Sequence, residues 1–345
     1  MPSEATYKVI LNKKDISANI SADLISLDYT DEVAGQSDEL SITLQDSKGL
    51  WKYEWYPEKG DELQAYITVN GKTLDCGIFE IDEVEASGSK DAGDVVIIKA
   101  LAAGIKDSVR TVKSYAHENK TLREVAATTA NKYGFKLVGE IPNIILSRQT
   151  QHRETDLHFL ASISAENGLQ FSLRNKQLIF TSIFNLESGN PVFSFVKSDL
   201  IDYNIKDKTA DTYVRATSSH FSPKKKKLIT MTIEYGVVTK NISTPKHDYL
   251  EIKTRTENEQ QAELKSKAAL YRANTLQQEG TIVIPGNVLV VSGINIELQQ
   301  LGMMSGLWHI TKSHHKVHKE NGYTTTPEIK RVNTIAKEKM KQPDA

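Results

Sequence analysis

Four of the nine histidines in the chain lie close together in GLWHITKSHHKVHKENGYTTTPEIKRV, residues 306–332. They are His309, His314, His315 and His318, and clustered imidazoles raise the question of a metal site or of acid–base catalysis. His314 and His318 are four residues apart, as a metal-binding pair on a helix would be. However, the glutamate that activates water in the HExxH zinc hydrolases is absent, so this signal for metal chemistry is weak.

The Trp, Ile, Thr and Val content of this stretch favours a strand over a helix. Successive side chains in a strand point to opposite faces, so His314 and His315 would diverge. His309 and His315 would share a face, but roughly 20 Å apart at ~3.3 Å per residue, which is too far to hold one ion. We therefore predict solvated strand and turn histidines, and no catalytic, cofactor-binding or metal-binding residue in the chain.

The end of the same stretch has the pattern of a β-hairpin. KENG, residues 319–322, is predicted to be the hairpin loop, and YTTTPEIKRV to be the returning strand. Pro327 lies within that returning strand and cannot donate a ladder hydrogen bond. The sequence therefore predicts that this last strand is an edge strand or that it stops early.

Two other groups could carry chemistry. The lone Cys76 excludes an internal disulfide framework, and it lies in the β-like run TLDCGIFEID with no charge-stabilising group nearby in sequence, which predicts a buried, inert thiol. The run Lys224–Lys227 lies between two β-like segments and is predicted to be a solvated hairpin turn. No phosphate-binding glycine motif and no GxSxG nucleophile motif occurs, so catalysis has no support from motifs.

The composition limits the kinds of partner. The 345 residues are 39% hydrophobic and 25% charged, and 43 basic against 44 acidic side chains leave a formal net charge of −1. No global field attracts nucleic acid or lipid, so we expect proteins or small molecules as partners and no specific nucleic-acid binding. Nowhere do about 18 apolar residues run together, which predicts no membrane insertion and folding in the cytoplasm.

The elements that must position these residues fall into three groups. Residues 7–100 alternate apolar and polar positions in short runs, which predicts an antiparallel barrel or sandwich. TLREVAATTANKYG follows, with a capping box at Thr121 and Glu124 and a C-terminal cap at Gly134, and the order helix, glycine, strand recurs at TDLHFLASISAENG. The residues predicted to be buried in these two helices are Leu122, Val125, Leu157 and Leu160. From residue 192 the β pattern returns, with one long helix at about 257–279.

In this order, the segments resemble the phage late control gene D protein family, which forms the tail hub of contractile phages and related injection machines. The segments that carry the resemblance are KKDISANI, LISLDYTDE, SDELSITLQD, GDELQAYI, DCGIFEIDEVEASG, KTLREVAATTANKYGF, ETDLHFLASISAENGLQFSL and GLWHITKSHHKVHKENGYTTTPEI. Each segment alone is loosely specific, but their order and spacing together cover nearly the whole chain.

The resemblance implies a mainly β fold with two small β-barrel, tube-type domains flanking a helix–strand domain. The implied divisions are 1–112, 113–188, 189–335 and a charged tail at 336–345. It also implies a homotrimeric ring with pseudo-sixfold symmetry that adapts the hexameric tail tube to the trimeric central spike, with other baseplate proteins around it. Such a hub assembles in the bacterial cytoplasm and then belongs to the tail or injection particle.

Two alternatives remain at this point. One is the hub part of a type VI-like spike complex, in which the spike is joined on the same chain; because this sequence ends after the second β-rich region, we expect a separate spike protein. The other is a hydrolase of the tail tip that degrades the cell wall. The chain has no spare segment of about 100 residues for a further domain, so we expect no enzyme and no cofactor.

Overall fold

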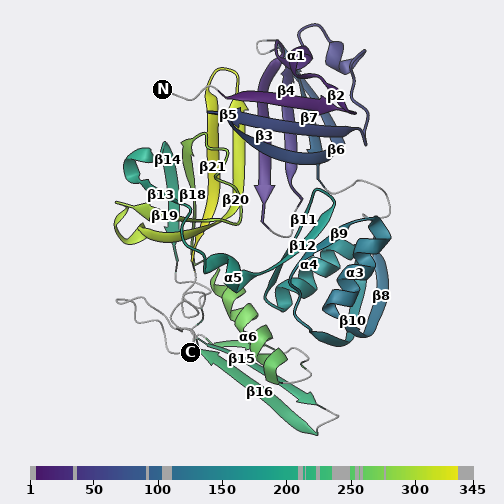
Figure 1. The fold of residues 1–345 in the computed structure, drawn as a ribbon, viewed down its shortest axis with the longest axis vertical. Coiled ribbons are helices and arrows are strands. Elements are labelled where there is room, and N and C mark those ends of the chain that lie inside the picture. Colours follow the sequence, from purple (N-terminus) through teal and green to yellow (C-terminus); the bar gives the residue numbers. More distant parts are fainter. Residues whose placement is uncertain are drawn as a thin grey trace.

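The computed structural model describes residues 5–33, 37–90, 93–102, 111–208, 213, 215–222, 226–234, 249–252, 256, 259–275 and 277–332. The fold is mainly β, with helices in the middle of the sequence and beside the C-terminal strands. Figure 1 shows a first β-region at the top, a mixed region of helices and strands at the lower right, and a second β-region at the left. Among the helices of these residues, none is long and apolar enough to cross a membrane.

The first β-region is an antiparallel sheet whose strands follow one another through short connections. Its pairing order is β3-β4-β7-β6-β5-β1-β2, and the short helices α1 and η1 lie in its connections. Buried and half-buried positions alternate along β4 and β5, which turns one face of each strand to the core. The elements are β1 Thr6–Leu11, β2 Lys14–Asp15, α1 Ser17–Ile20, β3 Leu24–Glu32, β4 Glu39–Gln45, η1 Leu50–Lys52, β5 Glu62–Val69, β6 Lys72–Ser89 and β7 Gly93–Leu101.

The mixed region contains the two predicted helices. The capping box at Thr121 begins α3, and Gly134 ends it in a left-handed conformation. The core prediction is confirmed for Leu122, Val125 and Leu160, whereas Leu157 is only half-buried. The elements are β8 Lys113–Thr121, α3 Leu122–Tyr133, β9 Lys136–Gly139, β10 Ile145–Glu154, α4 Asp156–Glu166, β11 Leu169–Arg174, β12 Gln177–Ser182 and α5 Ile183–Glu187.

The second β-region surrounds its own apolar core, with Trp308 and Ile310 fully buried in it. Between two of its strands the chain inserts a small sheet and the predicted long helix, which spans Glu259–Asn274. The strands of this region are β13 Phe193–Val196, β14 Asp202–Asp207, β18 Gln278–Pro285, β19 Asn295–Gln299, β20 Gly306–His318 and β21 Gly322–Arg331, with η2 Lys197–Asp199 and η3 Gly302–Met304 between them. The insert contains β15 Arg215–Ser222, β16 Lys227–Glu234, β17 Tyr249–Ile252 and α6 Glu259–Asn274.

The two β-regions share one 13-stranded sheet. Strand β20 pairs with β21 over most of its length, while its first half also pairs with β19 and its second half with β3. The main path is β14-β18-β21-β20-β3-β4-β7-β6-β5-β1-β2, and the described strands do not close into a ring. The two β-rich parts expected from the sequence are therefore joined edge to edge through the histidine strand.

The prediction for Pro327 was wrong. β21 continues to Arg331 and has a neighbour on both sides, β20 and β18. Towards β18 the register pairs Thr281 with Glu328 and Ile284 with Thr325, and the two positions between are unpaired. Because proline has no N–H to donate, the ladder is interrupted locally on that side while the strand itself goes on.

Three smaller predictions can be compared with the structure. The hairpin of β20 and β21 is confirmed, with His318 opposite Gly322. Cys76 is buried, as predicted, and burial raises the pKa of its thiol. In the lysine run, Lys227 pairs with Ser222 across a hairpin of β15 and β16 and Lys226 is exposed, whereas Lys224 and Lys225 lie outside the described residues.

Candidate functional site: the histidine strand and its two junctions

Strand β20 carries all four clustered histidines, but they are not placed as predicted. Ile310 lies opposite Ile329 and Lys312 opposite Glu328, so Thr311 is an extra residue, a β-bulge. The bulge reverses the alternation of faces within β20. The prediction that every histidine would be solvated was also wrong, because two of the four are buried.

The partners on β21 show which face of the sheet each histidine side chain occupies. His309 lies opposite Lys330 and His315 opposite Thr325, and these partners are five residues apart. Since an odd spacing in a strand means opposite faces, His309 and His315 do not share a face, contrary to the prediction. They are 2% and 0% exposed, while His314 is half-buried beside Asp28.

His315 lies where the first β-region meets the β20–β21 hairpin. Its Nδ1 is 2.7 Å from the Tyr323 hydroxyl, its Nε2 is 3.2 Å from Ser313 Oγ, and its ring stacks on Tyr29 of β3 with centroids 5.9 Å apart. Burial lowers the pKa of His315 to about 3, so the ring is neutral at pH 7. This arrangement joins two chain segments through aromatic contacts and hydrogen bonds without a buried charge.

A charged contact next to it brings in the mixed region. Arg174 of β11 donates to the fully buried carboxylate of Asp31, and its Nε lies 3.2 Å from Asp38 Oδ2. Asp31 also accepts the backbone N–H of Ser292 at 2.8 Å. Burial raises the pKa of Asp38 to about 7. Asp31 thus binds groups from the mixed region and from the second β-region. We call the group of His315, Tyr29, Tyr323, Asp31, Asp38 and Arg174 the upper junction.

The lower junction surrounds His309 and consists of His309, Asn295, Glu187, Lys330 and Tyr271. His309 Nδ1 is 2.8 Å from Asn295 Oδ1, and Asn295 donates its amide to the backbone carbonyl of Glu187 at 3.2 Å. The Glu187 side chain is 1% exposed. Its carboxylate forms an ion pair with Lys330 at 2.7 Å and accepts a hydrogen bond from the hydroxyl of Tyr271 in α6. Burial lowers the pKa of His309 to about 4, so here the charge is on the Glu187–Lys330 pair.

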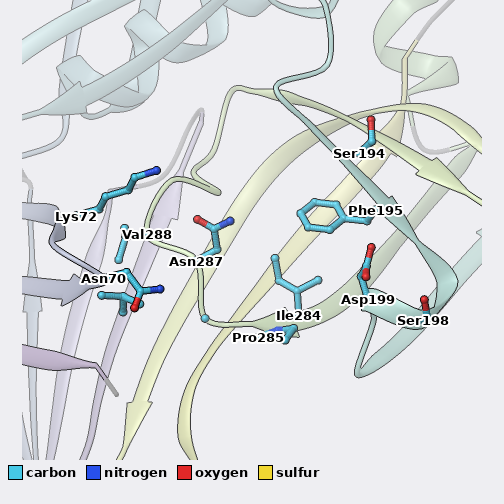
Figure 2. Close-up of a pocket in the computed structure, with 12 residues that line it drawn as sticks. Asn70, Lys72, Ser194, Phe195, Ser198, Asp199, Ile284, Pro285, Asn287 and Val288 are labelled. Atoms are coloured by element: carbon cyan, nitrogen blue, oxygen red, sulfur yellow. The ribbon is translucent and has the colours of Figure 1, made fainter. Parts of the chain in front are cut away.

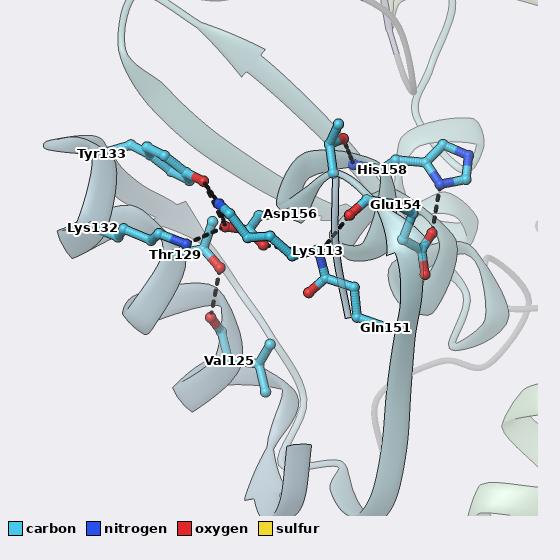
Figure 3. Close-up of polar contacts among 10 residues, drawn as sticks. Lys113, Val125, Thr129, Lys132, Tyr133, Gln151, Glu154, Asp156 and His158 are labelled. Atoms are coloured by element: carbon cyan, nitrogen blue, oxygen red, sulfur yellow. Dashed lines mark hydrogen bonds and ion pairs between the residues drawn. The ribbon is translucent and has the colours of Figure 1, made fainter. Parts of the chain in front are cut away.

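A third polar cluster lies within the mixed region (Figure 3). The carboxylate of Asp156, the first residue of α4, accepts hydrogen bonds from Lys132 at 2.7 Å, Tyr133 at 2.6 Å, Lys113 at 3.0 Å and Gln151 at 2.9 Å. Burial alone would raise the pKa of Asp156, but these donors outweigh it and hold that pKa well below its usual range. Each of these donors belongs to an element other than α4, so the cluster holds α3, α4, β8 and β10 together.

The structure also contains a surface cavity of about 640 Å³, between the β5–β6 turn and the end of β18. Figure 2 shows Asn70 and Lys72 on one side of it and Ser198 and Asp199 on the other, with Phe195 between. Its lining contains no paired nucleophile and base. Within the part of the chain that the structure describes, no group of three His, Cys, Asp or Glu side chains is placed so that it could hold a metal ion.

The upper and lower junctions therefore hold regions of the chain together. Sequence reasoning found the strand but missed Glu187, Lys330, Tyr271, Asp31 and Arg174. No local pattern marks these residues, since Arg174 and Asp31 are 143 residues apart and Tyr271 and Glu187 are 84 apart. Asp156 of the third cluster was missed as well, although Thr155 and Asp156 at the start of α4 were a local signal for it.

Comparisons with known proteins relate this arrangement to phage tails. No family model matches the chain. It is 31% identical over 177 residues to a protein of Escherichia phage P2 described as a probable baseplate hub protein, which is 50% of this chain and 44% of that one. It is 28% identical over 268 residues to the protein of the same description from Escherichia phage 186, which is 74% of this chain and 67% of that one.

The chain is therefore similar in sequence to two phage proteins described as probable baseplate hub proteins. The sequence match spans under half of the P2 protein and about two thirds of the 186 protein. The tail protein from Neisseria meningitidis MC58 has a similar fold, with a TM-score of 0.70 at 12% identity over 97% of this chain and 98% of that one. The E. coli c3393 protein, a component of the type VI secretion system, gives a TM-score of 0.52 at 11% identity over 89% and 73%. These two likenesses show the fold alone.

Proposed function

We propose that this chain is the structural hub of a contractile tail baseplate, where a homotrimeric ring adapts the hexameric tail tube to the trimeric central spike. The observation that carries the proposal is the sheet that β20 shares between the two β-regions. A trimer meets a six-subunit ring evenly only if each chain offers two comparable surfaces. The presence of two β-regions in one sheet supports such a pair of surfaces.

The ends of the long sheet support ring closure. Among the described strands, β14 pairs only with β18, and the outer side of β1 pairs only with the two-residue strand β2. Free edges present N–H and C=O groups that readily pair with another strand. In a closed ring each subunit applies one patch to a different patch on its neighbour, so both unlike ends would be covered.

The finer domain divisions belong to the same proposal. Residues 1–112 and 189–335 would act as two tube-type β-barrel domains, completed by neighbouring copies where the single chain leaves the sheet open. Residues 113–188 would form a helix–strand domain between them, and 336–345 a charged tail. Other baseplate proteins would surround the ring, which would assemble in the bacterial cytoplasm before it joins the particle.

We also propose that the chain is not an enzyme and needs no cofactor. His309, His315 and Asp156 form their hydrogen bonds with side chains of neighbouring elements of the chain. A type VI-like hub is the second candidate, supported by the fold likeness to the c3393 protein, while both sequence relatives are phage proteins. In such a hub the spike would be part of the same polypeptide.

The proposal is tested by mass and by binding. The purified chain should give a light-scattering mass three times its 38.5 kDa and a threefold ring in particle images. The ring should bind the tail tube protein and the spike protein of its own particle, each in a separate experiment. A stable monomer that binds neither partner would contradict the proposal.

A further inference from the structure

The connection between β4 and β5 exposes an unusual number of aromatic rings. We call Trp51, Tyr53, Trp55 and Tyr56 the aromatic loop. Tyr53 is 79% exposed, Trp55 42% and Tyr56 49%, while Trp51 is buried beneath them. Exposed aromatic side chains in one place are typical of protein interaction sites, because each ring contributes a large apolar area and a polar atom.

The aromatic loop is firmly held at its base. The backbone N–H of Trp51 donates to Asp46 at 3.0 Å, and its indole N–H donates to Asp23 at 3.1 Å. The ring of Trp55 packs edge-on against Trp51 with centroids 5.4 Å apart, and the Trp55 N–H donates to the carbonyl of Leu50 at 2.9 Å. A surface that is already ordered loses little conformational entropy when a partner binds.

The aromatic loop lies at one end of the strands of the first β-region. It begins where β4 ends, whereas the opposite end of β4 is close to Arg174 of the mixed region. The β20–β21 turn is at the same end as α1, because Lys319 donates to the carbonyl of Ala22 at 2.7 Å. In Figure 1 this end points upward, while the mixed region and α6 lie below. The upper end consists of turns and short helices.

The charges around the aromatic loop are balanced. Lys52 is paired with Asp94 and lies 4.0 Å from Asp46, so its charge is compensated within the chain. Glu54 and Glu58 are exposed, and so are Lys48 and Lys59 on the two sides of the loop. An aromatic surface without an excess of either charge fits a partner surface that is mainly apolar.

We infer that the aromatic loop is the surface by which this chain binds the tail tube, through a mainly apolar patch on the tube protein. This inference rests on the proposed function. If the ends of the sheet at β14 and β1 close the ring, the ends of the strands face along its axis, where a stacked ring docks. At the other end of such a ring lie the mixed region and α6. The turn-rich end is therefore the one available to the flat surface of the tail tube.

The test uses the full chain and the tail tube protein of its own particle. The variant Tyr53→Ala with Trp55→Ala should weaken tube binding at least tenfold, with an unchanged trimer mass and unchanged binding of the spike protein. Tyr115→Ala is the matched control, because Tyr115 is 56% exposed but belongs to β8 of the mixed region. The control should bind the tube as the wild type does.

A second measurement is the salt dependence of tube binding. Because the aromatic loop is mainly apolar and the exposed charges around it are balanced, tube binding should change little between low and high salt. Unchanged tube binding in the Tyr53 and Trp55 variant would overturn the inference, and so would loss of the trimer or of spike binding in its place. If the wild type itself forms no trimer and binds no tube, the proposed function fails, and that result is visible before any variant is made.

Discussion

The two junctions along β20 differ in the groups that surround their buried histidines. Each places a buried histidine where two regions meet, but tyrosines and a serine surround His315, while His309 lies beside the buried pair of Glu187 and Lys330. When one group of a neutral cluster is removed, one hydrogen bond is lost. When one partner of a buried ion pair is removed, the other charge stays buried without its counter-charge, which costs more. The ion pair beside His309 should therefore be more sensitive to a single substitution than the neutral groups around His315.

The largest effect is expected at the lower junction. Glu187→Gln keeps the size of the side chain but leaves Lys330 without its counter-charge, and breaking a buried pair in this way costs about 3–5 kcal/mol. Urea denaturation of the variant would measure the loss of unfolding free energy. The double variant Glu187→Gln with Lys330→Met should recover part of it, because no unpaired buried charge remains. A loss below ~1 kcal/mol in the single variant would mean that the pair is not desolvated.

The next effect is the dependence of stability on pH that His315 contributes. The pKa of His315 falls from its ordinary value near 6.5 to about 3 on folding, so between these values the unfolded chain binds more protons than the folded one. This contribution to stability is complete above about pH 6.5 and declines as the pH falls, by roughly 2–3 kcal/mol at pH 4.5. Denaturation midpoints of wild type and His315→Gln between pH 7 and 4.5 would show it. The variant should have the shallower acid dependence, and equal slopes would contradict a buried neutral ring.

A smaller loss is expected in the upper junction. Tyr323→Phe removes the hydroxyl that is 2.7 Å from His315 Nδ1 and leaves that nitrogen with only the weaker contact to Thr325 at 3.4 Å. The expected cost is about 1–2 kcal/mol of unfolding free energy, since one buried hydrogen bond is lost. If this loss exceeded that of Glu187→Gln, the expected order of the two histidine surroundings would be reversed.

The smallest effect is expected at the neighbouring half-buried histidine. His314 is 34% exposed and lies 3.1 Å from Asp28. Its replacement by Gln should change the unfolding free energy by less than about 0.5 kcal/mol, because partly exposed ion pairs contribute little. Thermal melting of the two single variants, His314→Gln and His315→Gln, would compare adjacent residues of one strand. Equal destabilisation would contradict the opposite faces assigned to them.

The sequence by itself determined the local elements. Alternation predicted the strands of the first β-region, the capping box at Thr121 predicted α3, and the KENG turn predicted the β20–β21 hairpin. Three of the four core positions predicted in the helices are buried. These features depend on residues within a turn or a strand of one another, so their periods and caps can be read directly from the chain.

Only the tertiary structure decided what the histidine strand does. The pairing of β20 with β3 and the bulge at Thr311 depend on strands that are distant in the sequence or on their register. Asp31 likewise contacts Arg174, 143 positions away, and Ser292, 261 positions away. One extra residue in a strand reverses every side chain after it, so the predicted common face of His309 and His315 failed at the bulge. Strand β20 has neighbouring strands on both edges and packed side chains on both faces, so its buried polar groups must form hydrogen bonds within the protein. Burial therefore keeps the rings of His309 and His315 neutral, and both rings help to hold the regions together.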